Sequence, residues 1–141
     1  MAQVTRFYDR VSGGDGPVSG ALQAISVGFD DVANSETVHR QIKFPAGMGF
    51  EITDISVISG SVTSDPALTI GSTAAGTEVV AAVNVTTNLG ALTIKEGTIA
   101  ASGLIDVRVV ADSGDAADNI SVTIVGYVTS PPTTVGTRPS A

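Results

Sequence analysis

The stretch that decides the fold reads GLIDVRVVA over residues 103–111, DSGDAADN over 112–119 and ISVTIVGYV over 120–128. The first and last parts alternate between apolar and polar side chains, and the middle part is a polar turn. Alternation of β-branched residues on both sides of such a turn predicts a β-hairpin with one buried face. The buried row is predicted to be Ile105, Val107, Val109, Ala111, Ile120, Val122, Ile124 and Val128, with Asp106 and Arg108 on the opposite face.

Shorter segments with strand character precede this stretch. They cover residues 22–29, 37–44, 50–62, 67–70, 78–85, 91–95 and 97–101. The segment 50–62 changes phase, because Phe50 and Ile52 share one parity while Ile55 and Val57 share the other, and we therefore expect a β-bulge at Thr53-Asp54. No segment combines helical spacing with a capping residue. About eight short strands predict an all-β, two-sheet sandwich, a jelly roll or a related Greek-key fold, whose strand order this pattern does not give.

The chain of 141 residues is expected to form one domain with two irregular ends. Residues 1–20 are predicted to be an N-terminal arm, because the run SGGDGP at 12–17 suits no regular element. The sandwich is predicted to cover 21–129. Residues 130–141 are rich in Pro and Thr and are predicted to form an extended tail.

Charge and composition exclude several classes of partner. The net charge is −7, so the phosphate backbone of nucleic acid is expected to repel this chain. No apolar run has the length of a signal peptide core or a membrane span, and we expect synthesis in the cytoplasm with no membrane partner. The chain lacks Cys and Trp, which excludes disulfides and disfavours a deep aromatic ligand pocket.

The residue types that commonly act in catalysis or metal binding do not form a recognisable catalytic or metal-binding motif in this sequence. His39 is the only His, and without Cys or a second His it supports neither zinc binding nor nucleophilic catalysis; it is predicted to be a polar residue on the solvent side of a strand. The three Asp of the turn 112–119 depart from the EF-hand order, so a solvated turn is favoured over a Ca²⁺ site. Glu51 and Asp54 flank the expected bulge and are candidates for a catalytic carboxylate pair. Neither lies in an apolar sequence setting of the kind that keeps a carboxyl protonated, so catalysis by this pair is disfavoured. We predict no enzyme activity, no cofactor and no metal.

An acidic, cysteine-free β-domain with irregular ends resembles the capsid decoration (cement) proteins of tailed bacteriophages. The resemblance lies in residues 50–57, 78–85 and 104–128. It implies a β-sandwich or jelly roll, often trimeric, that sits on the capsid surface of the virion, binds the major capsid protein and has no enzymatic activity. It transfers no individual functional residue.

Both ends and one strand position supply candidate contacts with partners. Phe7 and Tyr8 lie between two Arg and precede the glycine-rich run, which suits a docking peptide. Arg40 falls on the apolar parity of its strand, which indicates an open strand end or an interface. The candidate partner-binding residues are Arg6, Phe7, Tyr8, Arg10, Arg40, Pro131, Pro132 and Arg138.

These observations lead to the hypothesis of a homotrimeric structural protein on a phage capsid. Two alternatives belong to other functional classes. A head-fibre or tail-tip module for host recognition or carbohydrate binding needs exposed aromatic residues, which are scarce in this chain. A small hydrolase needs a catalytic motif, and the sequence shows none of the usual ones.

Overall fold

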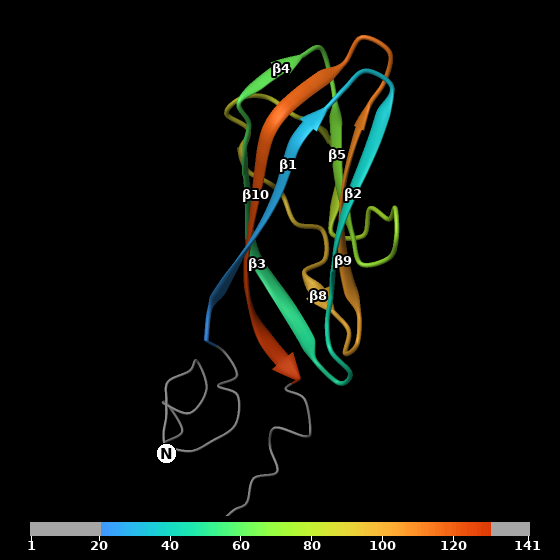
Figure 1. Cartoon of the computed structure of the whole chain (residues 1–141). Coiled ribbons are helices and arrows are strands. Elements are labelled where there is room, and N and C mark those ends of the chain that lie inside the picture. Colours follow the sequence, from blue (N-terminus) through green and yellow to red (C-terminus); the bar gives the residue numbers. More distant parts are fainter. Residues whose placement is uncertain (1–20, 131–141) are drawn as a thin grey trace, which may run out of the picture.

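The computed structural model describes residues 21–130, which form two antiparallel β-sheets and no helix. The first sheet has the order β1 (Gln23–Val32), β10 (Ala116–Ser130), β3 (Gly49–Ile58) and β7 (Gly90–Ala91), with β4 (Ser61–Thr63) beside β10 and β8 (Thr98–Ile99) beside β3. The second has the order β2 (Glu36–Lys43), β9 (Leu104–Ala111), β5 (Ala67–Gly71) and β6 (Val80–Asn84). The two sheets face each other (Figure 1), so the predicted β-sandwich is confirmed.

The strand pairs are nested along the sequence. Successive pairs move inward from both ends of the chain: Gln23 with Gly126, Glu36 with Ala111, Phe50 with Ile99, Ser56 with Ala91 and Ala67 with Asn84. The described chain is therefore one long antiparallel ribbon that turns back on itself between β5 and β6. Pairing of β10 with β3 and of β9 with β5 rolls this ribbon into two layers.

The predicted hairpin of the 103–128 stretch is wrong. β9 and β10 belong to different sheets, β9 between β2 and β5 and β10 between β1 and β3. Residues 112–115 therefore carry the chain from one layer to the other, across the roughly 10 Å that separates packed sheets. The alternating pattern identifies the buried face of each strand but not its partner. Two strands can bury such faces side by side in one sheet, as in a hairpin, or across the core from two different sheets, as here.

The core lies between the inward faces of the two sheets. All eight residues of the predicted buried row are at most 1% exposed, which confirms the assignment of the faces. Phe29 and Phe50 are the largest buried side chains, and the rings of Phe44 and Phe50 stack with centroids 5.3 Å apart. Each fully buried side chain of this size contributes about 1.5–3 kcal/mol to stability before entropy is counted, so the core needs no disulfide.

The predicted bulge lies where the phase of β3 changes. Asp54 pairs with Val125 and Ile52 with Gly126, so Thr53 is the extra residue, and its hydroxyl donates to the Val125 carbonyl at 3.2 Å. Gly126 allows this shift of register. A Cβ at Gly126 would overlap the Glu51 carbonyl oxygen and would lie 2.5 Å from the Phe50 ring.

Several predicted strand bounds change. The segment 50–62 divides into β3 and β4 where Gly60 N and the Ser59 hydroxyl both donate to the Asp118 carbonyl. The predicted strands 78–85 and 97–101 shorten to β6 and β8, and of the predicted strand 91–95 only Ala91 lies in a strand, β7. In contrast, β1 extends to Val32, and β10 begins at Ala116, inside the stretch predicted to be a polar turn.

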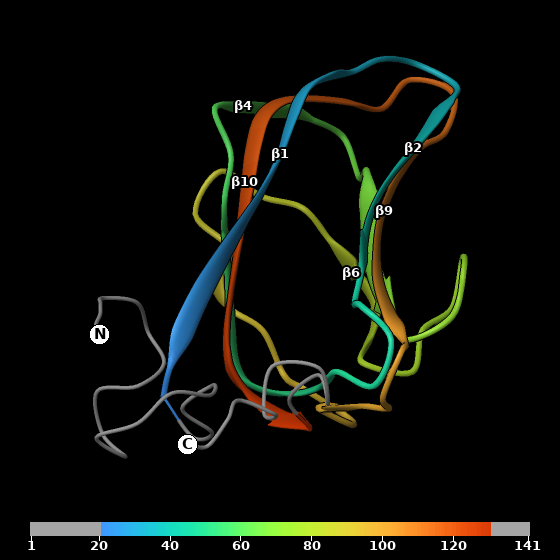
Figure 2. The same cartoon turned by 60° about the horizontal axis from the view of Figure 1, so that its bottom comes forward.

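Both ends of the described chain lie at the same end of the sandwich (Figure 2). The start of β1 pairs antiparallel with the last third of β10, where Gln23 lies opposite Gly126. The β2–β3 connection and the β8–β9 connection are at this end too, linked by the bond from Gly47 N to the Ser102 hydroxyl at 2.8 Å. The turns 33–35 and 112–115 lie at the other end.

The assignment of faces predicts the effect of a buried carboxylate. Ile124 is fully buried between Ile25 and Ile55 in register, so Ile124→Asp is expected to cost about 3–5 kcal/mol in the free energy of unfolding. Ser26→Asp, on the exposed face of β1, is expected to cost less than about 1 kcal/mol. Chemical denaturation measures both values, and equal losses would contradict the assignment of the faces.

The bulge predicts a difference between two glycines of the same sheet. Gly126→Ala is expected to destabilise the protein by about 1–3 kcal/mol, because the new Cβ meets the Glu51 carbonyl. Gly28→Ala is the matched control, since the nearest heavy atom to its Cβ is 4.0 Å away. Thermal and urea unfolding of both variants test this prediction, which fails if Gly126→Ala is as stable as Gly28→Ala.

Candidate functional site

Among the candidate partner-binding residues, only Arg40 lies in the described part of the chain. The other seven lie outside it: Arg6, Phe7, Tyr8, Arg10, Pro131, Pro132 and Arg138. The predicted N-terminal arm and all of the predicted tail beyond Ser130 also lie outside the described residues. The structure locates the places from which these segments leave the sandwich, at β1 and β10.

Arg40 closes one side of the sandwich. β1 and β2 are the edge strands of the two sheets on this side, and the Arg40 guanidinium on β2 lies over the Phe29 ring on β1, 5.2 Å from its centroid. Its Nη1 donates to the carbonyl of His39 at 3.0 Å. A cation over an aromatic face explains why a charged residue occupies an apolar parity, since the guanidinium contacts the buried Phe29 ring while Arg40 as a whole remains exposed. Its role in binding a partner stays a prediction.

The end of the sandwich opposite the chain ends is acidic. The segments 30–36, 61–66 and 112–118 meet there and contain no Lys or Arg; their acidic residues are Asp30, Asp31, Glu36, Asp65, Asp112, Asp115 and Asp118. The turn is not simply solvated, because Asp115 is only 8% exposed and accepts from Asp65 N at 3.1 Å and Asp112 N at 3.0 Å. Asp118 accepts from Ser61 N at 2.7 Å.

These bonds give the acidic residues structural roles as acceptors for backbone N–H groups. Within residues 21–130, no group of three or more His, Cys, Asp or Glu side chains has an arrangement that could hold a metal ion. The Glu51 carboxylate, considered above for catalysis, accepts from the Thr98 hydroxyl at 2.7 Å.

A polar cluster that links β2, β9 and the loop after β5 lies on the outer face of the second sheet. The Asp106 side chain on β9 is fully buried, and its carboxylate accepts from Ala75 N at 2.7 Å. His39 Nδ1 on β2 lies 3.1 and 3.2 Å from the two carboxylate oxygens, and the His39 side chain is 39% exposed. Because a carboxylate only accepts hydrogen bonds, the proton of this contact belongs to Nδ1. Sequence reasoning missed this pair because it required the β2–β9 register.

A carboxylate that orients an imidazole supplies two of the three members of a hydrolytic triad. The third member is a nucleophilic Ser, Thr or Cys beside the other imidazole nitrogen, and catalysis by this pair requires it. The chain has no Cys, and no Ser or Thr hydroxyl in residues 21–130 forms a hydrogen bond with His39 Nε2. In the adjacent loop, the Thr73 hydroxyl donates to the Glu78 carboxylate at 2.9 Å. The geometry instead suits a structural anchor for that loop.

The anchored loop is the turn of the ribbon between β5 and β6. It folds back over Asp106, and at its apex Ala75 has a φ of 58°, a left-handed conformation that a non-glycine residue adopts at some cost. At its base, the Glu78 carboxylate accepts from Ser72 N at 2.8 Å and from the Thr73 hydroxyl. Hydrogen bonds from the N–H of Glu78 itself, the Thr73 hydroxyl and Ser72 N hold the pKa of Glu78 below its ordinary value of 4.5.

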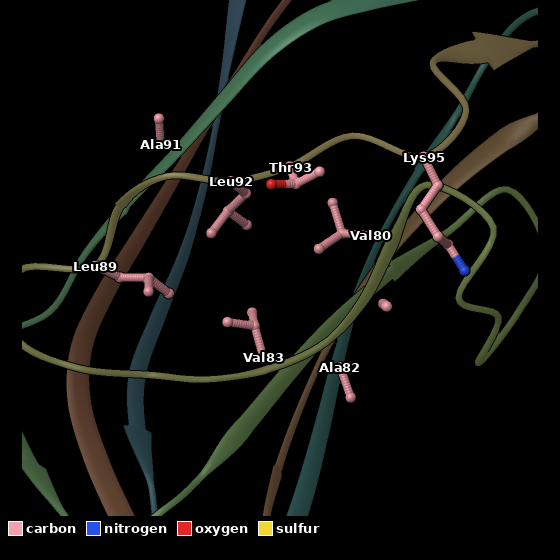
Figure 3. Close-up of a pocket in the computed structure, with 9 residues that line it drawn as sticks. Val80, Ala82, Val83, Leu89, Ala91, Leu92, Thr93 and Lys95 are labelled. Carbon is pink, nitrogen blue, oxygen red and sulfur yellow. The ribbon is translucent and has the colours of Figure 1, made fainter.

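An apolar groove of about 300 Å³ opens on the side of the sandwich opposite Arg40. One wall is β6, the edge of the second sheet, and the other is the segment 89–95, which includes β7 at the edge of the first sheet. Val80, Val83, Leu89 and Leu92 point into the groove, and Lys95 lies at its margin (Figure 3). No sequence motif indicated this groove, because its walls come from strands of different sheets.

The described residues offer few aromatic surfaces for carbohydrate. Phe29 and Phe50 are buried, Phe44 is half-buried against Phe50, and Tyr127 is half-buried on β10. Stacking on a sugar ring requires an exposed aromatic face, so this part of the chain gives the carbohydrate-binding alternative little support.

The lowered pKa of Glu78 predicts how loop stability depends on pH. Near pH 4.5 the unfolded chain binds more protons at this residue than the folded chain, so the contribution of Glu78 is complete above that pH and is lost as the pH falls through the lowered folded value. The difference in unfolding free energy between wild type and Glu78→Gln is therefore expected to shrink in acid.

Urea unfolding at a series of pH values measures this difference. Thr73→Val removes one of the hydrogen-bond donors and is expected to give an intermediate pH dependence. Stability curves of wild type and Glu78→Gln that run parallel from neutral pH into acid would contradict the assigned role of the carboxylate.

Comparisons with known proteins complete this description. The chain matches no protein-family model, no curated protein and no solved structure. Within the described residues, no helix has the length and apolar character required to cross a membrane.

Proposed function

We propose that this protein is a structural protein of a phage virion that binds the outer surface of the capsid and stabilises it. The partner is the major capsid protein, and the sandwich is a rigid platform for segments that hold neighbouring subunits. The proposal assigns no catalytic residue and no cofactor.

The observation that carries the proposal is the common exit of both chain ends. β1 begins at Gln23 and β10 ends at Ser130 at one end of the sandwich, so the segments with Arg6, Phe7, Tyr8, Arg10, Pro131, Pro132 and Arg138 all attach there. A domain that anchors itself to a lattice through two tails needs this arrangement, because both tails then reach the same surface. Several weak contacts from one rigid base combine through their effective concentration.

The distribution of charge supports one orientation on the capsid. The acidic residues of segments 30–36, 61–66 and 112–118 lie at the end away from the tails, while Arg6, Arg10 and Arg138 lie in the tails themselves. The tails therefore offer cations at the attached end, and the acidic end faces solvent. A uniformly acidic outer surface keeps decorated particles apart.

We also propose that the sandwich is a jelly roll. The nested register supports this finer assignment, because a jelly roll is a ribbon rolled into two antiparallel layers, and here the main strand orders of the two layers are β1-β10-β3-β7 and β2-β9-β5-β6. Jelly rolls occur in capsid proteins, lectins and enzymes, so the fold alone does not decide among these functions.

A homotrimer is part of the proposal. Two large apolar side chains of the described domain are exposed, Leu22 at 66% beside the attachment of the arm and Ile58 at 59% at the end of β3. Contact between copies would cover them, since exposed apolar groups gain free energy on burial.

Binding to capsids that lack the protein tests the proposed function. Deletion of residues 1–16 or of 131–141 is expected to reduce the apparent affinity by about tenfold or more, because each deletion removes one of several linked contacts. Asp31→Asn, at the acidic end, is the control and is expected to bind like the wild type. Quantitative cosedimentation of protein with capsids measures the three affinities.

The proposal fails if both truncated proteins keep the wild-type melting temperature and bind capsids as tightly as the full chain. Binding of the wild type to a glycan array together with no binding to capsids would instead support the host-recognition alternative.

A further inference from the structure

The apolar groove exposes part of its aliphatic lining to water. Val80 and Val83 on β6 and Leu89 and Leu92 on the facing segment point into it (Figure 3). Val80 is buried, whereas Val83, Leu89 and Leu92 are only half-buried. Because apolar surface gains free energy when it leaves water, the groove favours an occupant with an apolar body.

The groove is elongated, and its two ends differ. β6 advances about 10 Å between Val80 and Val83, which sets the length of one wall. Leu89 lies toward one end, and Lys95 lies at the other end beside Val80 (Figure 3). The bond from Lys95 N to the Val79 carbonyl, 2.7 Å long, holds the two walls together at the Lys95 end.

The size of the groove indicates a small occupant. Its volume of about 300 Å³ is at the low end of the range for small-molecule pockets, about 300–1,000 Å³. A heavy atom with its hydrogens occupies about as much space as a water molecule, roughly 30 Å³, so the groove holds on the order of ten such atoms. A free small molecule therefore fits it better than a protein segment.

Lys95 gives the groove a single charge. It is the only charged residue of the lining, and Thr93 is the only other polar one. Lys95 is exposed, and no Asp or Glu side chain within residues 21–130 forms an ion pair with it. A cation at one end of an aliphatic groove complements an apolar chain that ends in an anion. One ammonium balances one negative charge, which favours a carboxylate over a phosphate.

We propose that the groove binds an unbranched monocarboxylate of about eight carbons, the chemical class of octanoate. Its chain lies between β6 and the segment 89–95, and its carboxylate lies at Lys95. An extended alkyl chain of about eight carbons has nearly the length that β6 offers between Val80 and Val83. This binding site is on the side of the sandwich and goes beyond the proposed contact with a capsid.

Titration of the full chain with octanoate tests the proposal. The methyl signals of Val80, Val83, Leu89 and Leu92 in NMR spectra are expected to shift together and to saturate, while those of Val38, on β2 at the other side of the sandwich, stay in place. A series of carboxylates from butanoate to dodecanoate measures the length of the site. The affinity is expected to rise about two- to fourfold for each added CH₂ up to octanoate and then to level off.

A reversal of charge tests the position of the carboxylate. Lys95→Glu is expected to lower the affinity for octanoate about three- to tenfold and to raise the affinity for octylammonium by a similar factor, as expected for one exposed ion pair that becomes a repulsion. Lys43→Glu is the matched control, because Lys43 is also exposed but lies on β2, and the variant has the same net charge. It is expected to bind both ligands like the wild type.

Several outcomes would overturn the proposal. Equal octanoate affinities of Lys95→Glu and Lys43→Glu would remove the role of Lys95, and an affinity that keeps rising beyond octanoate would indicate adsorption to the surface without a defined site. Methyl shifts that follow the protein concentration and ignore octanoate would assign the groove to a contact between copies. Tighter binding of N-acetyl-leucine than of octanoate would assign it to the C-terminus of a protein. Capsid binding is measured separately, so failure here leaves the proposed function to its own test.

Discussion

Burial of the alternating faces of β9 and β10 against each other is the interaction on which the fold depends. Each strand is central in its own sheet, and each directs a row of Ile, Val and Ala into the same core. The two rows come from one continuous stretch of chain, so the turn at 112–115 passes from one sheet to the other at the end of the sandwich rather than closing a hairpin. This connection assigns the neighbouring strands to two sheets, since β1 and β3 pair with β10 while β2 and β5 pair with β9.

The rolled ribbon also determines which polar side chains are buried and hydrogen-bonded. Its turn between β5 and β6 folds over the outer face of the second sheet, and this contact buries Asp106 on a face that would otherwise meet water. The carboxylate is accommodated because Ala75 N and His39 Nδ1 donate to it, which compensates for its removal from solvent. His39 and Asp106 are thus a loop anchor produced by topology.

The two sides of the sandwich are closed in different ways. On one side, Arg40 covers the gap between β1 and β2 by lying over Phe29. On the other side, β6 and the segment 89–95 are the walls of an apolar groove. The sequence pointed to the first side, because Arg40 interrupts the apolar parity of its strand and so indicated an open strand end or an interface. It did not point to the groove, because the residues that line the groove follow no distinctive sequence pattern.

The sequence by itself determined the buried faces of β9 and β10, because the two-residue period of residues such as Ile120, Val122 and Ile124 decides which side chains avoid water. It also placed the bulge at Thr53, because a change of parity requires one extra residue. Only the tertiary structure decided which strands pair, since a buried face does not specify its partner. For the same reason, the burial of Asp106, its contact with His39 and the groove beside β6 appear only when residues far apart in the chain are brought together.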